Sequence, residues 1–554
     1  MLLLLFLLTG CNNDTKSPPD SDLARSPEEL DKKATDHIRQ SIEYAAAHNG
    51  DIGDSIFLFN TGLLQTAYER NSYEAFWNSR EQWKPLGDSL LFFIEKIKLY
   101  GLFPGDYHFP SLDSIRTRFL VDSLSRSDRK DAVLWSKADL MLTDAFFRIL
   151  KDIKLGRLPQ DSLTLRKDSV LNEDFYLQQL NILQKSGGIV KLVRYLEPKH
   201  KGYHLLKEGI QKFLDSADNR TYTKVPSPGK DPVNFKRTLQ KRLFESGLIA
   251  YDSIQADSAE LAAAVKKFQQ RKGIKVDGKA GDGTLRMLNT TDRERFISIA
   301  ISLDKYKLLP EKMPPRYIWV NLPGYSLQLV DADTVSIYSR VICGKPHTRT
   351  PQLTSAISEM ITYPQWTVPA SIIKKEILPA IKKNTGYLAR KGFSLLDKDG
   401  NVVNPDSVDW SKYSKGIPYR VVQGSGDANA LGVLKFNFSN KYSVYLHDTN
   451  QRYLFGQSNQ ALSHGCVRVQ DWQQLAVDIL QHDKKNTASG TDNRIDSLKS
   501  WLSKKEKRSI IVRNRVPLFI RYFTCEGKTG GIVFYDDIYG EDKRLGEKYF
   551  ALKR

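Results

Sequence analysis

The most reactive combination of side chains lies in the segment Ser463-His464-Gly465-Cys466-Val467-Arg468-Val469. A second histidine, His447, ends a run of strand-like residues, and 15 residues separate it from Ser463. A thiol near its ordinary pKa of about 8.5 is only partly ionised at neutral pH, and a neighbouring imidazole can remove its proton. The pattern therefore indicates a Cys466 nucleophile that is assisted by a histidine base.

His447 is the better candidate for that base, because it comes from a separate chain segment and can face the thiol freely. His464 stands only two residues before Cys466, where convergence on the thiol would require a very tight loop. To orient His447, we expect the backbone carbonyl of Asp448 rather than its carboxylate, which should point away. This pairing of Cys466 with His447 is a geometric hypothesis, since it requires a strand and a loop to converge.

The loop before the nucleophile has a second expected role. Gly465 permits backbone angles that other residues avoid, so the N–H groups of Gly465 and Cys466 could aim at a developing oxyanion. Ser463 and His464 belong to the same loop, and His464 could buttress it or add a donor. Arg468 offers a planar fork that suits a substrate carboxylate, although a structural ion pair would explain it equally well.

A metal-dependent peptidase is a competing interpretation. Its zinc ligands would come from His447, His464, Asp448 and Cys466. The sequence has no His-x-x-x-His motif and no paired cysteines at ligand spacing, so we expect neither a metal nor another cofactor.

Several regions must position these residues. Apolar residues recur at helical spacing through 27–231, which predicts a helical scaffold domain. Residues 232–292 read as a small unit of helices, and 293–314 as a linking helix. From 315 to 554, short β-branched and aromatic runs alternate with turn residues, which indicates a β-rich domain. A Lys-rich insert at about 371–418 interrupts the strands and reads as a lid, or else as a surface decoration.

The N-terminus predicts export. Residues Met1 to Leu8 are nearly all Leu or Phe, and this run is too short to span a bilayer, which needs about 20 residues. The following Leu8-Thr9-Gly10-Cys11 resembles a bacterial lipobox, in which the Cys11 thiol receives a diacylglycerol. Residues 1–11 would then be the lipoprotein signal and 12–26 a polar tether, although no Lys or Arg precedes the apolar run. An ordinary apolar start is the alternative, and Asn12 favours the outer membrane over the inner one.

Composition limits the partners. The net charge of +19 suggests an anionic partner, and the export signal argues against nucleic acid. A wall polymer with free carboxylates, a membrane surface or a merely solvated basic face all fit. Four cysteines are too few for a disulfide framework. Cys343 and Cys525 could pair or be buried, and their strand-like surroundings favour burial.

Two resemblances follow from these motifs. His447 followed by Ser-His-Gly-Cys-Val-Arg resembles the signature of L,D-transpeptidases with a YkuD-type catalytic domain. The stretch from Val265 to Asn289, with its Phe-Gln pair, Asp-Gly turn and Thr-Leu-x-x-Leu-Asn helix, resembles the three-helix peptidoglycan-binding module. The expected fold class is multidomain α+β: a helical scaffold, a three-helix module and a β-rich catalytic domain with a capping lid. Gly-Ser-Gly-Asp at 424–427 departs from the Pro-Gly pair of many members.

The resemblance implies an activity. A tetrapeptide donor would acylate Cys466 and release D-Ala, and the side-chain amine of a second stem peptide would take the acyl group in a 3-to-3 cross-link. Tyr445, two residues before His447, would line the site. Partners would be peptidoglycan stem peptides and glycan, the membrane through the lipid anchor, and cell-wall synthesis proteins, in the periplasm. An L,D-carboxypeptidase, a protein-anchoring transferase and a non-catalytic wall-binding lipoprotein remain alternatives.

Overall fold

The computed structural model describes residues 17–80, 82–124, 130–168, 170–218, 220–229, 231–251, 257–271, 276–483 and 493–550. The chain forms two compact units. The helical unit comprises residues 1–311, 526–533 and 545–554, and the β unit comprises residues 312–525 and 534–544. The predicted signal and the lipidated Cys11 lie outside the described residues.

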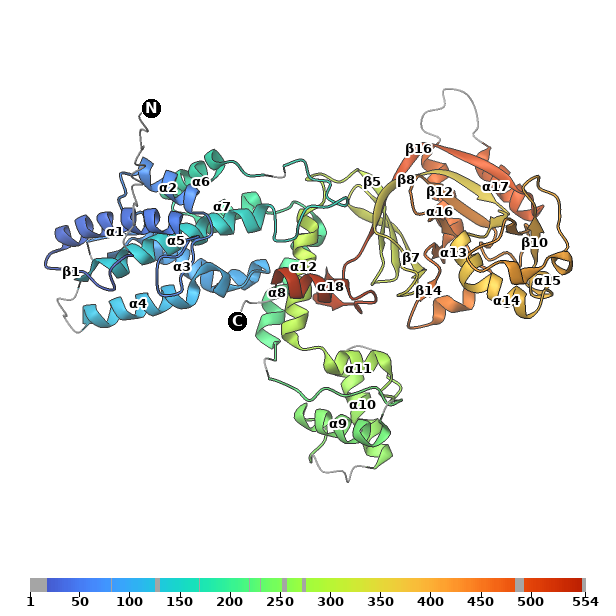
Figure 1. Cartoon of the computed structure of the whole chain (residues 1–554), viewed down its shortest axis with the longest axis horizontal. Helices are drawn as coiled ribbons and strands as arrows, with labels where there is room; N and C mark the ends of the chain where they lie inside the picture. The colour runs from blue at the N-terminus through green and yellow to red at the C-terminus, as the bar shows by residue number, and fades with distance from the viewer. Residues whose placement is uncertain are drawn as a thin grey trace, which may run out of the picture. The chain divides into compact units, whose positions relative to one another are not determined.

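The helical unit is built around α5 (Ala132–Lys154), whose residues are nearly all buried. The helices of its main core are α1 (Pro27–Ala47), α2 (Thr61–Arg70), α3 (Pro85–Glu95), α4 (Phe109–Leu124), α6 (Glu173–Ser186) and α7 (Ile189–Leu196) (Figure 1). Tyr68, Phe76, Trp77 and Asn78 all hydrogen-bond to the buried carboxylate of Asp139. Burial raises the pKa of Asp139 to about 6, and these donors oppose the rise.

The expected linking helix is instead part of this unit. Helix α12 (Asp292–Lys307) begins with a capping box between Thr291 and Glu294 and contacts α8 (Lys201–Ser216). Its Lys307 ammonium is buried and donates to the carboxylate of Asp304 at 2.8 Å and to the carbonyl of Asp152 at 2.7 Å. The helix expected at 293–314 forms as α12, and most of its residues from Arg295 to Lys307 are buried.

The small module contains α9 (Pro232–Glu245), α10 (Ser258–Arg271) and α11 (Asp282–Asn289) around an apolar core. The buried amide of Gln269 accepts hydrogen bonds from the N–H groups of Asp277 and Gly278 at 3.0 and 2.9 Å and donates to Thr284 at 3.0 Å. This explains why a glutamine and an Asp-Gly turn occur together. The module begins before 232, since Val225 and Asn289 exchange two hydrogen bonds.

The main sheet of the β unit has nine strands in the order β14-β7-β15-β13-β12-β8-β16-β5-β6. An additional pairing of β6 with β7 closes eight of these strands into a ring. The strands are β5 (Arg316–Asn321), β6 (Ser326–Asp331), β7 (Thr334–Gly344), β8 (Leu353–Thr362), β12 (Leu434–Phe438), β13 (Leu446–His447), β14 (Ala461–Ser463), β15 (Val467–Val469) and β16 (Arg508–Arg521). Helices α16 (Trp472–Asp483) and α17 (Arg494–Ser503) add apolar side chains to its core.

The insert is a subdomain with its own core. Strands β9 (Trp366–Thr367), β10 (Phe393–Leu396) and β11 (Arg420–Gln423) form a separate sheet. With α13 (Ala370–Ile372), the π-helical turn η3 (Ile373–Ile377), α14 (Leu378–Lys383) and α15 (Tyr387–Arg390), they enclose an apolar cluster. Strand β11 belongs to this small sheet and not to the main one, so the insert extends to both sides of the expected 371–418.

Two other expected boundaries differ. Residues Leu23–Ala24 pair with Lys130–Asp131, so the predicted tether at 12–26 does not extend to residue 26. The tail was expected to belong wholly to the catalytic domain, but residues 526–533 and 545–554 belong to the helical unit. There Gly527 lies against the backbone of Leu205 and Leu206, where a Cβ would come within 2.1 Å.

Two other cysteines lie inside the protein. Cys343 and Cys525 are both buried, which confirms the preference for burial. Burial raises the pKa of the Cys343 thiol to about 12. No helix within the described ranges combines the length and apolar character that crossing a bilayer requires.

Candidate active site

The candidate nucleophile and base lie on neighbouring parallel strands. In the register of β13 and β15, Leu446 is opposite Val467 and His447 is opposite Arg468. The N–H of Val467 donates to the carbonyl of Tyr445 at 3.1 Å, which aligns Tyr445 with Cys466. Because alternate side chains of a strand share one face, the side chains at 445, 447, 466 and 468 all project to the same side. The opposite face carries Leu446, Val467 and Val469 into the core.

Strand β12 brings a further cation to this face. Lys435 is opposite His447 in the antiparallel register of β12 and β13. Its ammonium nitrogen lies 4.0 Å from the centre of the Tyr445 ring. The Tyr445 ring in turn contacts the His447 ring edge-to-face, with 5.6 Å between the centroids. Lys435 was not among the expected site residues. It stands between Leu434 and Phe436, and this alternation is typical of a strand with one polar face.

The environment of His447 keeps its imidazole neutral. The side chain is only 4% exposed, and burial lowers its pKa to about 3, with the positive charge of Arg468 adding to the shift. The backbone groups of Asp448 and Leu431 partly oppose this shift. Nδ1 makes no hydrogen bond within the described part of the chain. A neutral imidazole is the form that can accept a proton.

The thiol of Cys466 is partly exposed and is also neutral in this state. Burial raises its pKa, while the backbone and hydroxyl of Tyr445 and the charges of Lys435 and Arg468 lower it. The sulfur lies 3.9 Å from the carbonyl oxygen of Ser443. The resting site therefore contains a thiol and a neutral imidazole rather than a thiolate and an imidazolium.

A hydroxyl closes the loop that carries the nucleophile. Ser463 Oγ donates to the carbonyl of Cys466 at 2.6 Å and accepts the N–H of Gly465 at 3.1 Å. Thr350 binds the Gly465 carbonyl at 2.8 Å, and Gly465 has a φ of +125°, which favours glycine. The expectation that the Gly465 amide is an oxyanion donor was wrong, because Ser463 uses it. The Cys466 amide has no acceptor among the described residues.

Arg468 has no acidic partner in the described structure. One terminal nitrogen donates to Gln451 Oε1 at 3.1 Å, and Nε is buried without an acceptor. The alternative of a structural ion pair therefore loses its basis. Burial lowers the pKa of the guanidinium, and the negative charge of an ionised Cys466 would raise it. The Arg468 guanidinium can therefore donate hydrogen bonds to a substrate carboxylate.

Asp448 supports the strands and faces away from the imidazole, as expected. Its buried carboxylate accepts from the Val433 N–H at 3.0 Å and from the Arg452 guanidinium at 2.8 Å. Gly432 has a φ of +63°, and a Cβ there would lie 2.3 Å from this carboxylate. The Gly432 turn and Asp448 thus fix the β12–β13 pair that presents Lys435 and His447.

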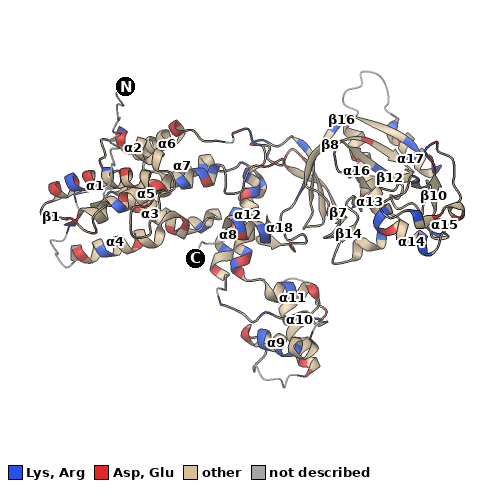
Figure 2. Ribbon diagram, in the orientation of Figure 1, with Lys and Arg blue, Asp and Glu red and all other residues tan. Residues whose placement is uncertain are grey.

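His464 connects the nucleophile loop to the insert rather than to the thiol. Its Nε2 lies 2.6 Å from Glu376 Oε1 on η3, and both side chains are partly exposed. Around this contact the insert is basic, with Lys374, Lys375, Lys382 and Lys383 on η3 and α14 (Figure 2). The insert therefore meets the loop of Cys466 through an ion pair and offers cations nearby.

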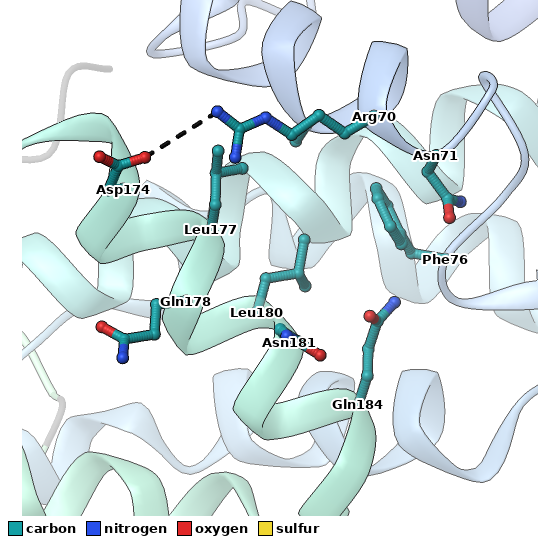
Figure 3. A pocket seen from close by; sticks show the side chains of 10 residues that line it. Arg70, Asn71, Phe76, Asp174, Leu177, Gln178, Leu180, Asn181 and Gln184 are labelled. Atoms are coloured by element: carbon teal, nitrogen blue, oxygen red, sulfur yellow. Dashed lines mark ion pairs between the residues drawn. The ribbon is translucent and has the colours of Figure 1, made fainter.

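The structure also has a pocket of about 560 Å³ in the helical unit, between α2 and α6. Leu177, Leu180 and Phe76 supply apolar surface, and Gln178, Asn181 and Gln184 project from α6 (Figure 3). Arg70 and Asp174 approach within 3.9 Å at its rim. These residues offer hydrogen bonds but no thiol, hydroxyl or imidazole, so we expect covalent chemistry at Cys466.

Three regions of the chain match described families. Residues 315–485 match YkuD, the "L,D-transpeptidase catalytic domain", residues 62–210 match a "Scaffold domain", and residues 229–288 match a "Putative peptidoglycan binding domain". The 315–485 match contains every residue of the face described above.

Similarity to individual proteins is narrower. A "Putative L,D-transpeptidase" of Haemophilus influenzae is 36% identical over 264 residues, which are 47% of this chain and 52% of that protein. The chain thus spans about half the length of this relative. The crystal structure of an L,D-transpeptidase (Yku) from Stackebrandtia nassauensis is 17% identical and covers 47% of this chain and 89% of its own, with a TM-score of only 0.17. Residues 315–485 therefore resemble the catalytic domain of YkuD L,D-transpeptidases, in a chain whose residues 229–288 resemble a peptidoglycan-binding domain.

Proposed function

We propose that this chain is an L,D-transpeptidase that forms 3-to-3 peptidoglycan cross-links through a thioester on Cys466. The observation that carries this proposal is the common sheet face of Cys466, His447, Tyr445 and Arg468, with an unused Cys466 amide beside the thiol. The two family matches support a wall substrate, because one model describes an L,D-transpeptidase catalytic domain and the other a putative peptidoglycan-binding domain.

In the first half-reaction, His447 accepts the proton of the Cys466 thiol. The sulfur then bonds to the carbonyl carbon of the residue before the terminal D-Ala of a tetrapeptide donor, and the Cys466 N–H stabilises the oxyanion. The C–N bond breaks, and the D-Ala amine leaves with the proton held by His447. Arg468 binds a carboxylate of the donor and so holds the scissile bond near the sulfur.

In the second half-reaction, the side-chain amine of another stem peptide attacks the thioester carbon. The new C–N bond forms, the C–S bond breaks, and one amine proton returns through His447 to the sulfur, which regenerates the thiol. The insert, joined to the nucleophile loop by the Glu376–His464 pair, would cover the acyl-enzyme and keep water away. Water as the acceptor would instead give an L,D-carboxypeptidase.

Muropeptide analysis by mass spectrometry tests the proposal. The purified full chain is incubated with disaccharide-tetrapeptides, and the products are compared with those of a reaction without enzyme. We expect 3-to-3 dimers together with free D-Ala. Tripeptides without dimers would show hydrolysis, and transfer to a protein amine would show an anchoring enzyme. Unchanged tetrapeptide would support a non-catalytic wall-binding protein.

Arg468→Ala should mainly weaken donor binding. A hydrogen bond to a charged group is worth about 1.5–3 kcal/mol, so KM for the tetrapeptide should rise about 10- to 100-fold, with a smaller change in kcat. Arg468→Lys keeps the positive charge but lacks the planar guanidinium fork. Its KM should therefore lie between those of the wild-type protein and Arg468→Ala. Steady-state kinetics with varied donor concentration measure this, and an unchanged KM would contradict the carboxylate role.

The pH dependence should reflect the low pKa of His447. The active base is neutral, so lowering its pKa to about 3 extends activity to lower pH. We expect kcat/KM to change little between pH 7 and pH 5 at constant ionic strength. An imidazole with an ordinary pKa of 6.5 would instead lose about 30-fold at pH 5. A clear acid limb near pH 6.5 would refute the buried neutral imidazole.

We also propose that Cys11 carries a lipid that anchors the protein in the periplasm, with the outer membrane favoured. The support is the Leu-Thr-Gly-Cys sequence at 8–11. Cells fed an alkyne fatty acid should label the wild-type protein, whereas Cys11→Ser should remain unlabelled and leave the membrane fraction. Labelling that survives in Cys11→Ser would contradict this anchor.

A further inference from the structure

Two cations on the sheet face of Cys466 lack the partners that partly buried charges normally have. Neither Lys435 nor Arg468 has a carboxylate within ion-pair distance in the described ranges of the chain. Both are partly buried, and desolvation lowers the pKa of each side chain. A site that holds two such cations is complete only when two negative charges are present.

We propose that Lys435 is the electrostatic partner of the Cys466 thiolate, and that Arg468 is reserved for the carboxylate of the donor. Lys435 lies on β12 with its ammonium 4.0 Å from the centre of the Tyr445 ring, and the Tyr445 hydroxyl and the Lys435 charge both act on the Cys466 thiol. The ammonium stays protonated and takes no part in bond formation, so Lys435 acts as a positioning residue. The inference rests on the proposed role of Cys466 as the nucleophile.

The need for such a partner follows from the neutral resting pair. Transfer of the thiol proton to His447 creates a thiolate and an imidazolium beside two cations, and the low pKa of the imidazole opposes this transfer. A fixed positive charge near the sulfur stabilises the thiolate and so favours the proton transfer. This charge does not have to reorient when the thiolate forms. The hydrogen bonds of Tyr445 lower the pKa of Cys466 most, and of the two cations Lys435 has a larger effect than Arg468. In return, an ionised Cys466 raises the pKa of Lys435.

The shapes of the two cations support these separate roles, with Lys435 beside the thiolate and Arg468 for the donor carboxylate. A thiolate is a single anionic atom, which suits the compact ammonium of lysine, whereas a carboxylate suits the bidentate guanidinium. Arg468 also has a buried Nε without an acceptor in the described part of the chain. The other charged or titratable groups that face the thiol are Tyr445 and His447 on β13, and Glu359 on β8 acts on Lys435.

The test measures the ionisation of Cys466 directly. The full-length protein is alkylated with iodoacetamide at a series of pH values, and mass spectrometry follows the peptide that contains Cys466. Iodoacetamide is neutral, so the variants do not alter its attraction to the site. We expect Lys435→Met to raise the midpoint of the alkylation profile by about one pH unit, which is about tenfold slower alkylation below the midpoint. Lys435→Arg should restore most of the shift.

A matched control comes from the neighbouring loop. Lys441 also lies over a tyrosine ring, 5.4 Å from the centre of Tyr442, but it is exposed. Lys441→Met should leave the profile unchanged, and Arg468→Met should move it less than Lys435→Met does. Lys435→Gln is a second neutral variant in case Lys435→Met does not fold, as judged by circular dichroism.

The outcomes separate this inference from the proposed function. An unchanged profile in a folded Lys435→Met or Lys435→Gln protein would overturn the role of Lys435, even if cross-linking continued. A larger shift in Arg468→Met than in Lys435→Met would reverse the division of roles. A shifted profile in a protein that forms no cross-links would uphold the thiolate partner and refute the proposed transpeptidation. With active enzyme, Lys435→Met should lower kcat, whereas Arg468→Met should raise KM.

Discussion

Cys466→Ala should eliminate 3-to-3 dimers while the protein keeps its fold. The thiol supplies the bond that defines the acyl-enzyme, and loss of a nucleophile in comparable enzymes reduces kcat by about 10⁶-fold. The change leaves the loop intact, because Ser463 binds the backbone carbonyl of Cys466 and not its side chain. Muropeptide analysis measures the dimers, and intact-protein mass spectrometry should show an acyl adduct only on the wild-type protein.

Cys343→Ala is the matched control for this variant. Cys343 is buried on β7 beside the same sheet, and burial raises its thiol pKa to about 12, so it cannot act as a nucleophile at neutral pH. We expect this variant to retain cross-linking with a modest loss of stability from the small cavity. Dimers formed by Cys466→Ala at the wild-type rate would remove the nucleophile assignment and with it the thioester mechanism.

The local part of the site was predictable from the sequence. His447 was expected at the end of a strand-like run that would converge with the loop of Cys466, and Tyr445, two residues earlier, was expected to line the same site. The observed strand is shorter, since only Leu446–His447 pairs as β13. The direction of the Asp448 carboxylate was also predictable, because adjacent residues of a strand point to opposite faces.

The non-local part was not predictable. Lys435 joins the site because β12 pairs with β13, and no sequence pattern gives the neighbour of a strand. The contact between His464 and Glu376 joins residues 88 positions apart. The use of the Gly465 amide by Ser463 depends on a loop conformation that one glycine permits but does not specify. Similarly, the return of residues 526–533 and 545–554 to the helical unit depends on packing that appears only in the folded chain.

His447→Ala should reduce the rate about 10²- to 10⁴-fold, because the variant has no imidazole to take the thiol proton or to protonate the departing amine. His447 contributes little to donor binding, so the loss should appear in kcat rather than in KM. His482→Ala is the matched control, since His482 lies at the end of α16 and contacts Asp478 and Asp331. It should retain full activity in the same cross-linking assay.

The comparison with His464→Ala decides which histidine is the base. His464 binds Glu376 of the insert, so its loss should loosen the contact between the insert and the nucleophile loop without removing the proton acceptor. We expect the cross-linking rate to fall less than tenfold and the share of hydrolysed tripeptide to increase, because water reaches the thioester more easily. A larger rate loss in His464→Ala than in His447→Ala would reverse the base assignment. Replacing the residue that accepts the proton must reduce the rate more than replacing the residue that contacts the insert.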